Sequence, residues 1–292
     1  MSQASPGIIG VIGVGLLGSA LCHRLHLAGH NVIGYDTQAK QLEYLLHIGG
    51  QAARSVEEVA KSSNTILLSL PDSQISKTVC ADIGAYASPD STVIDTTTGS
   101  PEDAISNSQL LAAKGIQFLD ATVAGSSSQV HDGKGVMMVG GNPEVFNRYF
   151  QLLDNISDVV FHVGPVGSGA RVKLMVNLAI GLNRAVLAET LALADASGID
   201  LQTALEVLKA TPAYSAAMDV KGEKMIAQDF TPQARLRQHR KDVDLIRNLA
   251  EQYDQKLPLS DLHAAILDTA INAGLGDLDN SAVYKVIRDN LS

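Results

Sequence analysis

The residues most suited to chemistry are a lysine and an amide set in an apolar stretch. Residues 164–177 read GPVGSGARVKLMVN, and the apolar character continues to about Ala196. Lys173 lies inside this stretch, and an ammonium group is seldom buried without a partner or a task. Apolar surroundings and the positive end of a helix both lower the pKa of a lysine, which suits it to take up and return a proton. The alternative is a structural lysine that extends to a carboxylate at the surface.

Asn177 follows Lys173 by four residues. Residues with this spacing share one face of a helix, so both side chains are expected to point in the same direction. We therefore expect the Asn177 amide to hydrogen-bond either Lys173 or the substrate.

A second group of residues has the spacing of a dinucleotide-binding site. Three glycines of GVIGVGLLG form a GxGxxG pattern between an expected strand and an expected helix, and Asp36 ends the next strand. Such glycines allow a tight turn, close approach of a pyrophosphate and close helix packing, while the helix N-terminus attracts phosphate. The alternative is that the glycines serve packing only. The expected cofactor contacts here are Gly13, Gly15, Leu16, Leu17, Gly18, Asp36 and Thr37.

Asp36 also bears on the choice of cofactor. A carboxylate accepts hydrogen bonds from the ribose hydroxyls of NAD and repels the 2′-phosphate of NADP. Thr37 provides no arginine to offset that repulsion, although Lys40, one turn away, would partly relieve it. We expect NAD to be preferred over NADP.

The first half of the chain alternates short apolar runs with helical patterns. The runs are mostly β-branched and apolar on both faces, which is typical of buried parallel strands. This predicts an α/β fold, a Rossmann-type doubly wound sheet with right-handed crossovers, over residues 1–166. The expected strands are 8–13, 31–36, 65–70, 91–96, 116–123, 136–141 and 159–164, with helices between them such as 16–28 and 101–114.

The second half of the chain shows helical patterns only. One long helix, about 169–197, is apolar nearly all round and is therefore expected to be buried. Ser168 is its expected N-cap and Gly198 its expected C-terminal stop. Residues 167–292 are predicted to form an all-helical domain for substrate binding and oligomerisation, with further helices at 201–210, 234–253 and 259–273.

Composition excludes several classes of protein. The chain has 292 residues, 46% hydrophobic and 18% charged, and a net charge of −9, which argues against nucleic-acid binding. Two cysteines without metal-type spacing indicate a reducing compartment, and the eight histidines form no metal-ligand pattern. The apolar N-terminal run is too short to span a bilayer, and residues 1–7 lack the basic residues of a signal peptide. We expect a cytoplasmic protein with no metal and no membrane partner.

Four segments together resemble the β-hydroxyacid dehydrogenase family, the group of 3-hydroxyisobutyrate dehydrogenase and tartronate semialdehyde reductase. The segments are GVIGVGLLGSAL, DATVAGSSSQVHDGKGVMMVGG (120–141), the stretch 164–177, and KDVDLI (241–246) with GLGDLDNSAV (274–283). They span almost the whole chain in the family's order.

The resemblance implies a dinucleotide domain, a long inter-domain helix and a helical domain. It implies that a 3-hydroxy acid and its semialdehyde exchange a hydride with a nicotinamide, and that the chain forms a homodimer or homotetramer. Carried over by position, Lys173 is the catalytic lysine and Asn177 its neighbour. The positions implied to contact the cofactor are Leu70, Pro71, Thr98 and Lys241.

The segment expected to bind the substrate carboxylate departs from the family pattern DAPVSGG. Thr122 replaces proline, Ala124 replaces serine and Ser126 replaces glycine. The expected substrate contacts are Ala124, Gly125, Ser126, Lys173 and Asn177; alternatively, the serines cap local backbone. The basic segment QARLRQHRKD offers further anion contacts or a solvated helix face, through Arg235, Arg237, His239 and Arg240.

Two other functions remain open on the same fold. One is reduction of an imine or of a substrate without a carboxylate, and the other is a non-catalytic dinucleotide-binding scaffold. Such proteins usually lack the lysine at this position, so the presence of Lys173 favours the hydroxy-acid enzyme.

Overall fold

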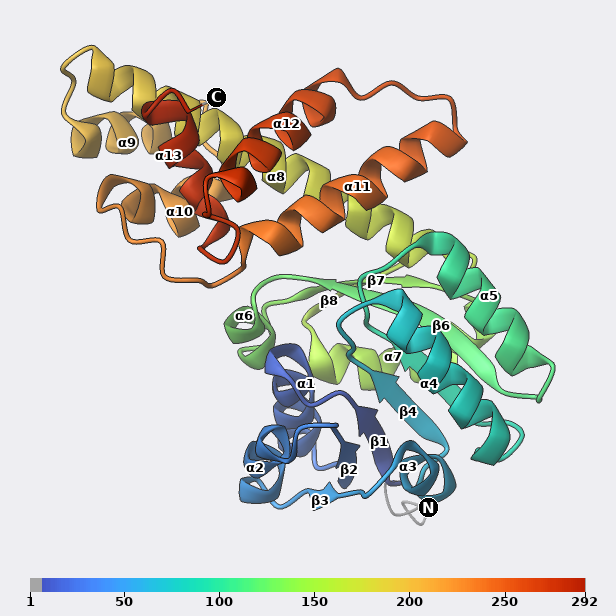
Figure 1. Ribbon diagram of the computed structural model, residues 1–292. Coiled ribbons are helices and arrows are strands. Elements are labelled where there is room, and N and C mark those ends of the chain that lie inside the picture. Colours follow the sequence, from blue (N-terminus) through green and yellow to red (C-terminus); the bar gives the residue numbers. More distant parts are fainter. Residues whose placement is uncertain (1–6, 292) are drawn as a thin grey trace. The chain divides into compact units, whose positions relative to one another are not determined.

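The computed structural model describes residues 7–291 and divides the chain into two compact units, Met1–Lys173 and Leu174–Ser292. The first unit is built on a single sheet with helices on both faces, and the second is helical (Figure 1). The predicted fold class is confirmed.

The sheet of the first unit has eight strands in the order β3-β2-β1-β4-β5-β6-β7-β8. All neighbouring strands are parallel except β6 and β7, and the register aligns Ile12 with Tyr35 and Leu68, and Leu68 with Asp95. The carboxyl ends of β2, β1, β4 and β5 therefore meet at one edge. The strands are β1 (Ile9–Ile12), β2 (Val32–Tyr35), β3 (Gln51–Ala52), β4 (Thr65–Leu68), β5 (Thr92–Asp95), β6 (Gln117–Ala124), β7 (Val136–Gly140) and β8 (Val159–Gly164).

All seven expected strands are present, but two expectations about them are wrong. Strand β7 runs antiparallel to β6, because the connection between them holds only a five-residue helix and a parallel crossover needs a dozen or more residues. Strand β8 lies at the sheet edge with Phe161 54% exposed, so it is not buried on both faces. The two-residue β3 was not expected; its exposed Gln-Ala pair carries no hydrophobic pattern.

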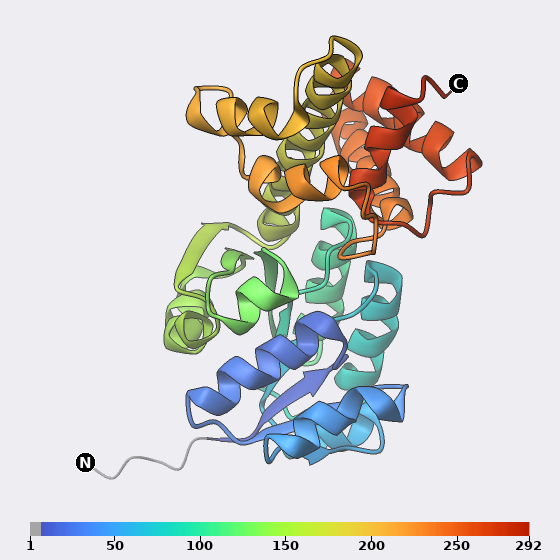
Figure 2. The ribbon, with the colours of Figure 1, turned by 90° about the vertical axis from the view of Figure 1, so that its left-hand side faces the viewer.

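Helices cover both faces of the sheet (Figure 2). One face packs against α1 (Leu16–Leu27), α2 (Leu42–His47), α6 (Ser127–His131) and α7 (Pro143–Ile156), which share a core with β1 and β6. The other face packs against α3 (Val56–Ser62), α4 (Ser73–Tyr86) and α5 (Pro101–Ala112). Apolar side chains on both faces explain why the strands lack an alternating pattern.

The second unit gathers its helices around one core that includes Leu187, Leu191, Leu205, Val243 and Tyr284. Within the described residues this unit has no strand, only one isolated bridge between Arg235 and Asp279. Its helices are α8 (Ser168–Ala196, which begins in the first unit), α9 (Leu201–Ala210), α10 (Ala216–Ile226), α11 (Leu236–Gln252), α12 (Pro258–Asn272) and α13 (Val283–Arg288).

The end of α8 is the one expected. Gly198 has a φ of +76°, and its N–H donates to the Asp195 carbonyl while that of Ile199 donates to the Ala194 carbonyl. This pair of hydrogen bonds around a glycine in the left-handed conformation is a common helix termination.

The expected burial of α8 is wrong for the chain taken alone. Met175, Ile180, Val186 and Leu193 are 46–70% exposed, and only 33% of the most apolar part of the helix is buried. The helix is long and apolar enough to cross a membrane by length and composition alone, but Leu187 and Leu191 pack in the core of the second unit. A helix that is apolar on all sides needs its surface covered, but the pattern does not show whether the same chain or another subunit covers it.

Candidate functional site

The glycine loop joins β1 to α1. Gly13 has a φ of +87°, and a Cβ added there would lie 2.2 Å from the Ser69 carbonyl oxygen. A Cβ on Gly18 would lie 2.0 Å from the Gly13 carbonyl oxygen, whereas one on Gly15 would meet no atom within 4 Å. Two of the glycines are thus required by packing, and the third leaves open space above its backbone.

The first turn of α1 suits an anion. The N-cap is Gly15, which has no side chain to occupy the helix end, and the first turn contains no acidic residue. Leu16 is 79% exposed and Leu17 is half-buried. Helix N–H groups with partial positive charge are therefore available to a phosphate at this edge.

Asp36 is fixed beside the glycine loop. Its Oδ2 accepts a hydrogen bond from the Val14 N–H (2.9 Å), and its Oδ1 accepts one from the Gln38 N–H (2.8 Å). A carboxylate has about four acceptor sites, so two remain for other donors. Thr37 is exposed next to it.

The segments after β4 and β5 complete this edge of the sheet. The Leu70 N–H donates to the Thr97 hydroxyl (3.2 Å), which ties the two segments together. Pro71 is exposed and Thr98 half-buried. Because β4 lies next to β1 and β5 lies next to β4, all parallel, the structure brings Leu70, Pro71 and Thr98 to the edge that carries the glycine loop.

The segment DATVAGSSS forms the end of β6 and the start of α6. Ser126 is the N-cap of α6: its hydroxyl accepts from the Gln129 N–H (3.2 Å), and its own N–H donates to the Gln129 side chain (2.8 Å). The serine therefore caps local backbone, as one of the two interpretations predicted. In this cap the Ser126 hydroxyl acts as an acceptor, so its hydrogen can still be donated to another group. Ala124 is half-buried, and Gly125 is exposed with a φ of +134°.

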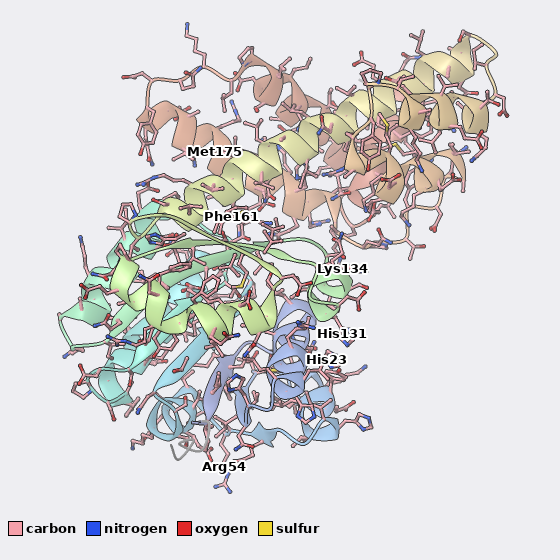
Figure 3. All side chains as sticks on the ribbon, turned by 180° about the vertical axis from the view of Figure 1, so that it is seen from behind. His23, Arg54, His131, Lys134, Phe161 and Met175 are labelled. Carbon is pink, nitrogen blue, oxygen red and sulfur yellow. The ribbon has the colours of Figure 1, made fainter. Side chains whose placement is uncertain are left out.

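Helix α6 packs against α1 through a pair of histidines. The rings of His23 on α1 and His131 on α6 stack with centroids 3.7 Å apart (Figure 3). The Tyr44 hydroxyl lies 2.8 Å from His23 Nδ1. Burial, followed by the nearby His131, lowers the pKa of His23, which favours the neutral form of the His23 ring. The loop after β6 is thus anchored to the helix that follows the glycine loop.

The start of α8 differs from the expectation. Ser168 is the first helical residue and not the N-cap, and the N–H groups of Gly167 and Ala170 donate to the buried Asp120 carboxylate of β6 instead (3.0 Å each). A capping acceptor supplied by a distant strand leaves no local sequence signal. Lys173 lies in the second turn of this helix and is half-buried.

In the second unit, Asn177 has a partner that the sequence analysis missed. Its amide nitrogen donates to Asp242 Oδ2 on α11 (3.2 Å). Asp242 directly follows Lys241, which is exposed, in the KDVDLI segment. The KDVDLI segment pointed to this region of α11, but the sequence analysis assigned a role to Lys241 and none to Asp242.

Three of the four basic residues singled out around α11 are paired or buried, and Arg235 is exposed. Arg237 pairs with Asp277 (2.7 Å) and Arg240 with Asp268 (2.7 Å), so both guanidinium groups are engaged. His239 is buried, and burial lowers its pKa well below the usual value, with Arg184 and His263 acting in the same direction.

Two family models match the chain. Residues 8–164 match the NAD-binding domain of 6-phosphogluconate dehydrogenase, and residues 167–287 match the NAD-binding domain of NADP-dependent 3-hydroxyisobutyrate dehydrogenase.

Individual relatives are similar over nearly their full length. The chain is 31% identical over 282 residues to 2-(hydroxymethyl)glutarate dehydrogenase of Eubacterium barkeri, covering 95% of this chain and 94% of that protein. It is 26% identical over 283 residues to glyoxylate/succinic semialdehyde reductase 1 of Arabidopsis thaliana, covering 96% and 98%. The structure of 3-hydroxyisobutyrate dehydrogenase from Salmonella typhimurium superposes with a TM-score of 0.89 at 27% identity, covering 96% of this chain and 99% of that one. The chain therefore belongs to the β-hydroxyacid dehydrogenase family, whose NAD(P)-dependent oxidoreductases include 3-hydroxyisobutyrate dehydrogenase.

Proposed function

We propose that the chain interconverts a small 3-hydroxy acid and its semialdehyde or oxo acid with NAD(H), and that Lys173 is the general acid/base. The observation that carries this proposal is the placement of Lys173 in the second turn of α8, whose first turn is hydrogen-bonded to β6. Strand β6 leads directly into Ala124–Ser126, where we expect the substrate carboxylate. The names of the relatives, a hydroxy-acid dehydrogenase and a semialdehyde reductase, support the same reaction class.

The reaction needs one proton transfer besides the hydride. In oxidation, the hydride leaves the carbinol carbon and the neutral Lys173 Nζ takes the hydroxyl proton; in reduction, the ammonium returns a proton to the forming alkoxide. The nicotinamide of a bound dinucleotide accepts or supplies the hydride. Asn177 has two amide hydrogens, and one is used on Asp242, so the other is available to the lysine or the substrate.

The residues around the glycine loop fit a dinucleotide. Gly15 leaves room for close approach, the N-terminus of α1 favours phosphate, and Asp36 retains acceptor sites for ribose hydroxyls. We propose that NAD is preferred over NADP, because the fixed Asp36 carboxylate would repel a 2′-phosphate. Leu70, Pro71, Thr98 and Lys241 are proposed as the remaining cofactor contacts.

The substrate carboxylate would bind at the loop between β6 and α6. The Ser126 N–H is used on Gln129, so we propose that the donors are the Ser126 hydroxyl and the Gly125 N–H. Ala124 cannot replace the hydroxyl of the family's serine at its own position, and Ser126 is the residue that supplies one nearby.

We also propose that the chain acts as a homodimer or homotetramer. The exposed apolar side chains along α8 make up a surface that a monomer would leave in water. Light scattering coupled to size-exclusion chromatography measures this directly, and a monomer at micromolar concentration would contradict it.

The test of the function is a substrate screen with both cofactors. Purified protein is assayed with NADH and NADPH against semialdehydes, glyoxylate and simple aldehydes without a carboxylate, and in reverse with 3-hydroxy acids. We expect turnover only with the acidic carbonyl compounds and a higher kcat/KM with NADH. Higher kcat/KM with NADPH would refute the cofactor preference, and turnover confined to the aldehydes without a carboxylate would refute the substrate class.

A further inference from the structure

Asp120 is a buried carboxylate that the proposed chemistry does not use. It lies in the middle of β6 and is 2% exposed. Its Oδ1 accepts from the Gly167 N–H and its Oδ2 from the Ala170 N–H, at 3.0 Å each. Ala170 is in the first turn of α8, where N–H groups have no partner within the helix. One side chain thus satisfies two backbone donors at the start of the helix that carries Lys173.

A second side chain of β6 holds the same turn. The Thr122 hydroxyl donates to the Gly169 carbonyl oxygen (2.9 Å). In an α-helix that carbonyl is also the acceptor for the N–H of the residue four positions later, which is Lys173. The family pattern has proline at position 122, which has no hydroxyl, so this contact depends on a residue at which the chain departs from that pattern.

Two glycines allow the backbone of neighbouring elements to approach Asp120 closely. A Cβ on Gly169 would lie 2.5 Å from the Asp120 carbonyl oxygen and 2.8 Å from Oδ2. A Cβ on Gly140, in the neighbouring β7, would lie 2.3 Å from Oδ1. The backbone of α8 therefore meets β6 at a distance that only glycine permits.

The charge of Asp120 is balanced between opposing effects. Burial raises the pKa of Asp120 to about 6, and the hydrogen bonds from Ala170 and Gly167 act against that rise. The ionised form is the one that accepts both N–H groups, and it faces the positive end of α8. The other ionisable group that acts on it is the buried Asp95 of β5, which raises the pKa further.

We propose that Asp120, assisted by Thr122, is a positioning residue that sets the place of Lys173 relative to the substrate loop. Asp120 and Thr122 precede Ala124–Ser126 on the same strand, and Lys173 follows Ala170 by three residues on the same helix, all within the first unit. The end of β6 and the first turns of α8 thus connect the proton-transfer group to the carboxylate site. Catalysis is sensitive to such placement, since an error of 1 Å costs about 100-fold in rate. The inference rests on the proposed role of Lys173.

The test combines kinetics with amide exchange in Asp120→Asn and Thr122→Val, two changes that nearly preserve volume. We expect Asp120→Asn to lower kcat about 10- to 100-fold, with NADH affinity and KM changed less than threefold. The isotope effect measured with deuterated NADH should rise, because chemistry becomes slower than product release. Thr122→Val, which leaves the carboxylate in place, should act in the same direction but more weakly. A role in folding alone would lower the active fraction without changing the isotope effect.

Asp279→Asn is the matched control, because Asp279 is a buried carboxylate that also accepts backbone N–H groups but lies in the second unit. It should lower stability while the folded fraction keeps its kcat and isotope effect. Hydrogen exchange of the amides in residues 164–173 gives a readout independent of substrate. We expect at least tenfold faster exchange there in Asp120→Asn, and unchanged exchange would overturn the proposal.

The outcomes separate this proposal from the proposed function. If Lys173→Met abolishes turnover while folded Asp120→Asn retains wild-type kcat, the positioning role is wrong and the function stands. If the wild-type protein turns over no acidic carbonyl compound, the function is wrong, and the exchange experiment still decides whether Asp120 fixes the start of α8.

Discussion

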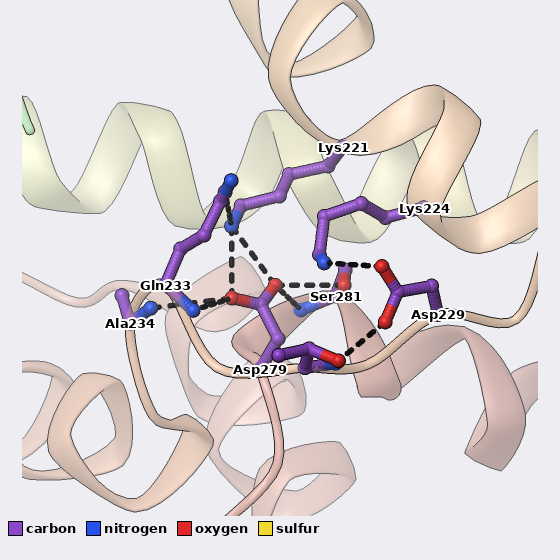
Figure 4. A network of polar contacts seen from close by, with 8 residues as sticks. Lys221, Lys224, Asp229, Gln233, Ala234, Asp279 and Ser281 are labelled. Carbon is purple, nitrogen blue, oxygen red and sulfur yellow. Dashed lines mark hydrogen bonds and ion pairs between the residues drawn. The ribbon is translucent and has the colours of Figure 1, made fainter.

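Replacing Asp279 with asparagine should destabilise the helical unit severely. Asp279 lies in the loop after α12 and is fully buried; its two oxygens accept from Lys221 Nζ (2.9 and 3.0 Å) and from the N–H groups of Gln233 (2.8 Å) and Ala234 (3.2 Å) (Figure 4). Ser281 donates through both its N–H and its hydroxyl. One carboxylate thus connects three separate segments of this unit.

The expected loss of stability follows from the pKa of Asp279 and from its ion-pair partner, Lys221. Burial alone would raise this pKa, but the hydrogen bonds from Lys221, Gln233 and Ser281 outweigh burial and lower it to about 2. Relative to about 3.9 in the unfolded chain, this corresponds to about 2.5 kcal/mol of stability at neutral pH, lost as the pH falls from about 4 to 2. The asparagine variant also leaves the Lys221 ammonium buried without its counter-charge, and breaking a buried pair in this way costs about 3–5 kcal/mol.

Urea unfolding at pH 7, followed by circular dichroism, measures the change. We expect Asp279→Asn to lower the free energy of unfolding of the helical unit by about 3–5 kcal/mol, and Lys221→Met to relieve part of the loss in the double variant. Asp229→Asn is the control: Asp229 pairs with Lys224 in the same region but is exposed, so solvent screens its charge and its loss should matter far less. A loss below about 1 kcal/mol in Asp279→Asn, or equal losses in both aspartate variants, would refute the reasoning.

Three further predictions concern other parts of the chain. Burial, followed by Arg184 and Arg240, lowers the pKa of His263 to about 4. As the pH falls, the unfolded chain therefore protonates this residue first, and the free energy of unfolding should fall by about 3 kcal/mol between pH 6.5 and 4. Urea unfolding across this range measures the decline, and an equal decline in His263→Gln would contradict the prediction. Burial raises the pKa of Cys22 to about 12 and raises that of Cys80 as well, so neither thiol should react with a disulfide reagent in the native protein although both react in urea; rapid native labelling would show the burial to be wrong. Gly18→Ala should lower the melting temperature because its methyl group would lie 2.0 Å from a carbonyl oxygen, whereas Gly15→Ala should keep it and weaken NADH binding; the expectation fails if calorimetry and titration show the reverse pattern.

The sequence predicted the elements whose own residues carry the signal, either an unbroken apolar run or a residue with a special backbone conformation. The runs around Val11, Leu67 and Ile94 are apolar on both faces because helices cover both sides of the sheet, so all of the longer strands were found. The end of α8 was equally clear, because only glycine readily adopts the conformation found at Gly198.

The features that could not be predicted depend on contacts between distant residues. Nothing near Ser168 indicates that its capping role falls to Asp120, 48 positions earlier. The Asn177–Asp242 contact and the burial of His239 likewise depend on how α11 packs on α8 in the second unit. The direction of β7 is set by the length of a connection whose short helix has too few residues to show a period.

The second aspartate of GLGDLDNSAV illustrates the limit of a motif. The resemblance marked this segment as characteristic of the family, and its position near the end of the chain gave no indication of a role. In the structure Asp279 ties together the loops around Gln233 and Ser281, which is a stabilising role.

The most direct test of the central claim is the rate of hydride transfer in Lys173→Met. With a semialdehyde or glyoxylate that the wild-type protein reduces, mixing at saturating NADH should show a rate lowered by about 100- to 10,000-fold in the variant. NADH binding and the melting temperature should remain close to wild type, because methionine retains the apolar stem of the side chain. A variant that binds NADH and reduces the substrate at the wild-type rate would contradict the account.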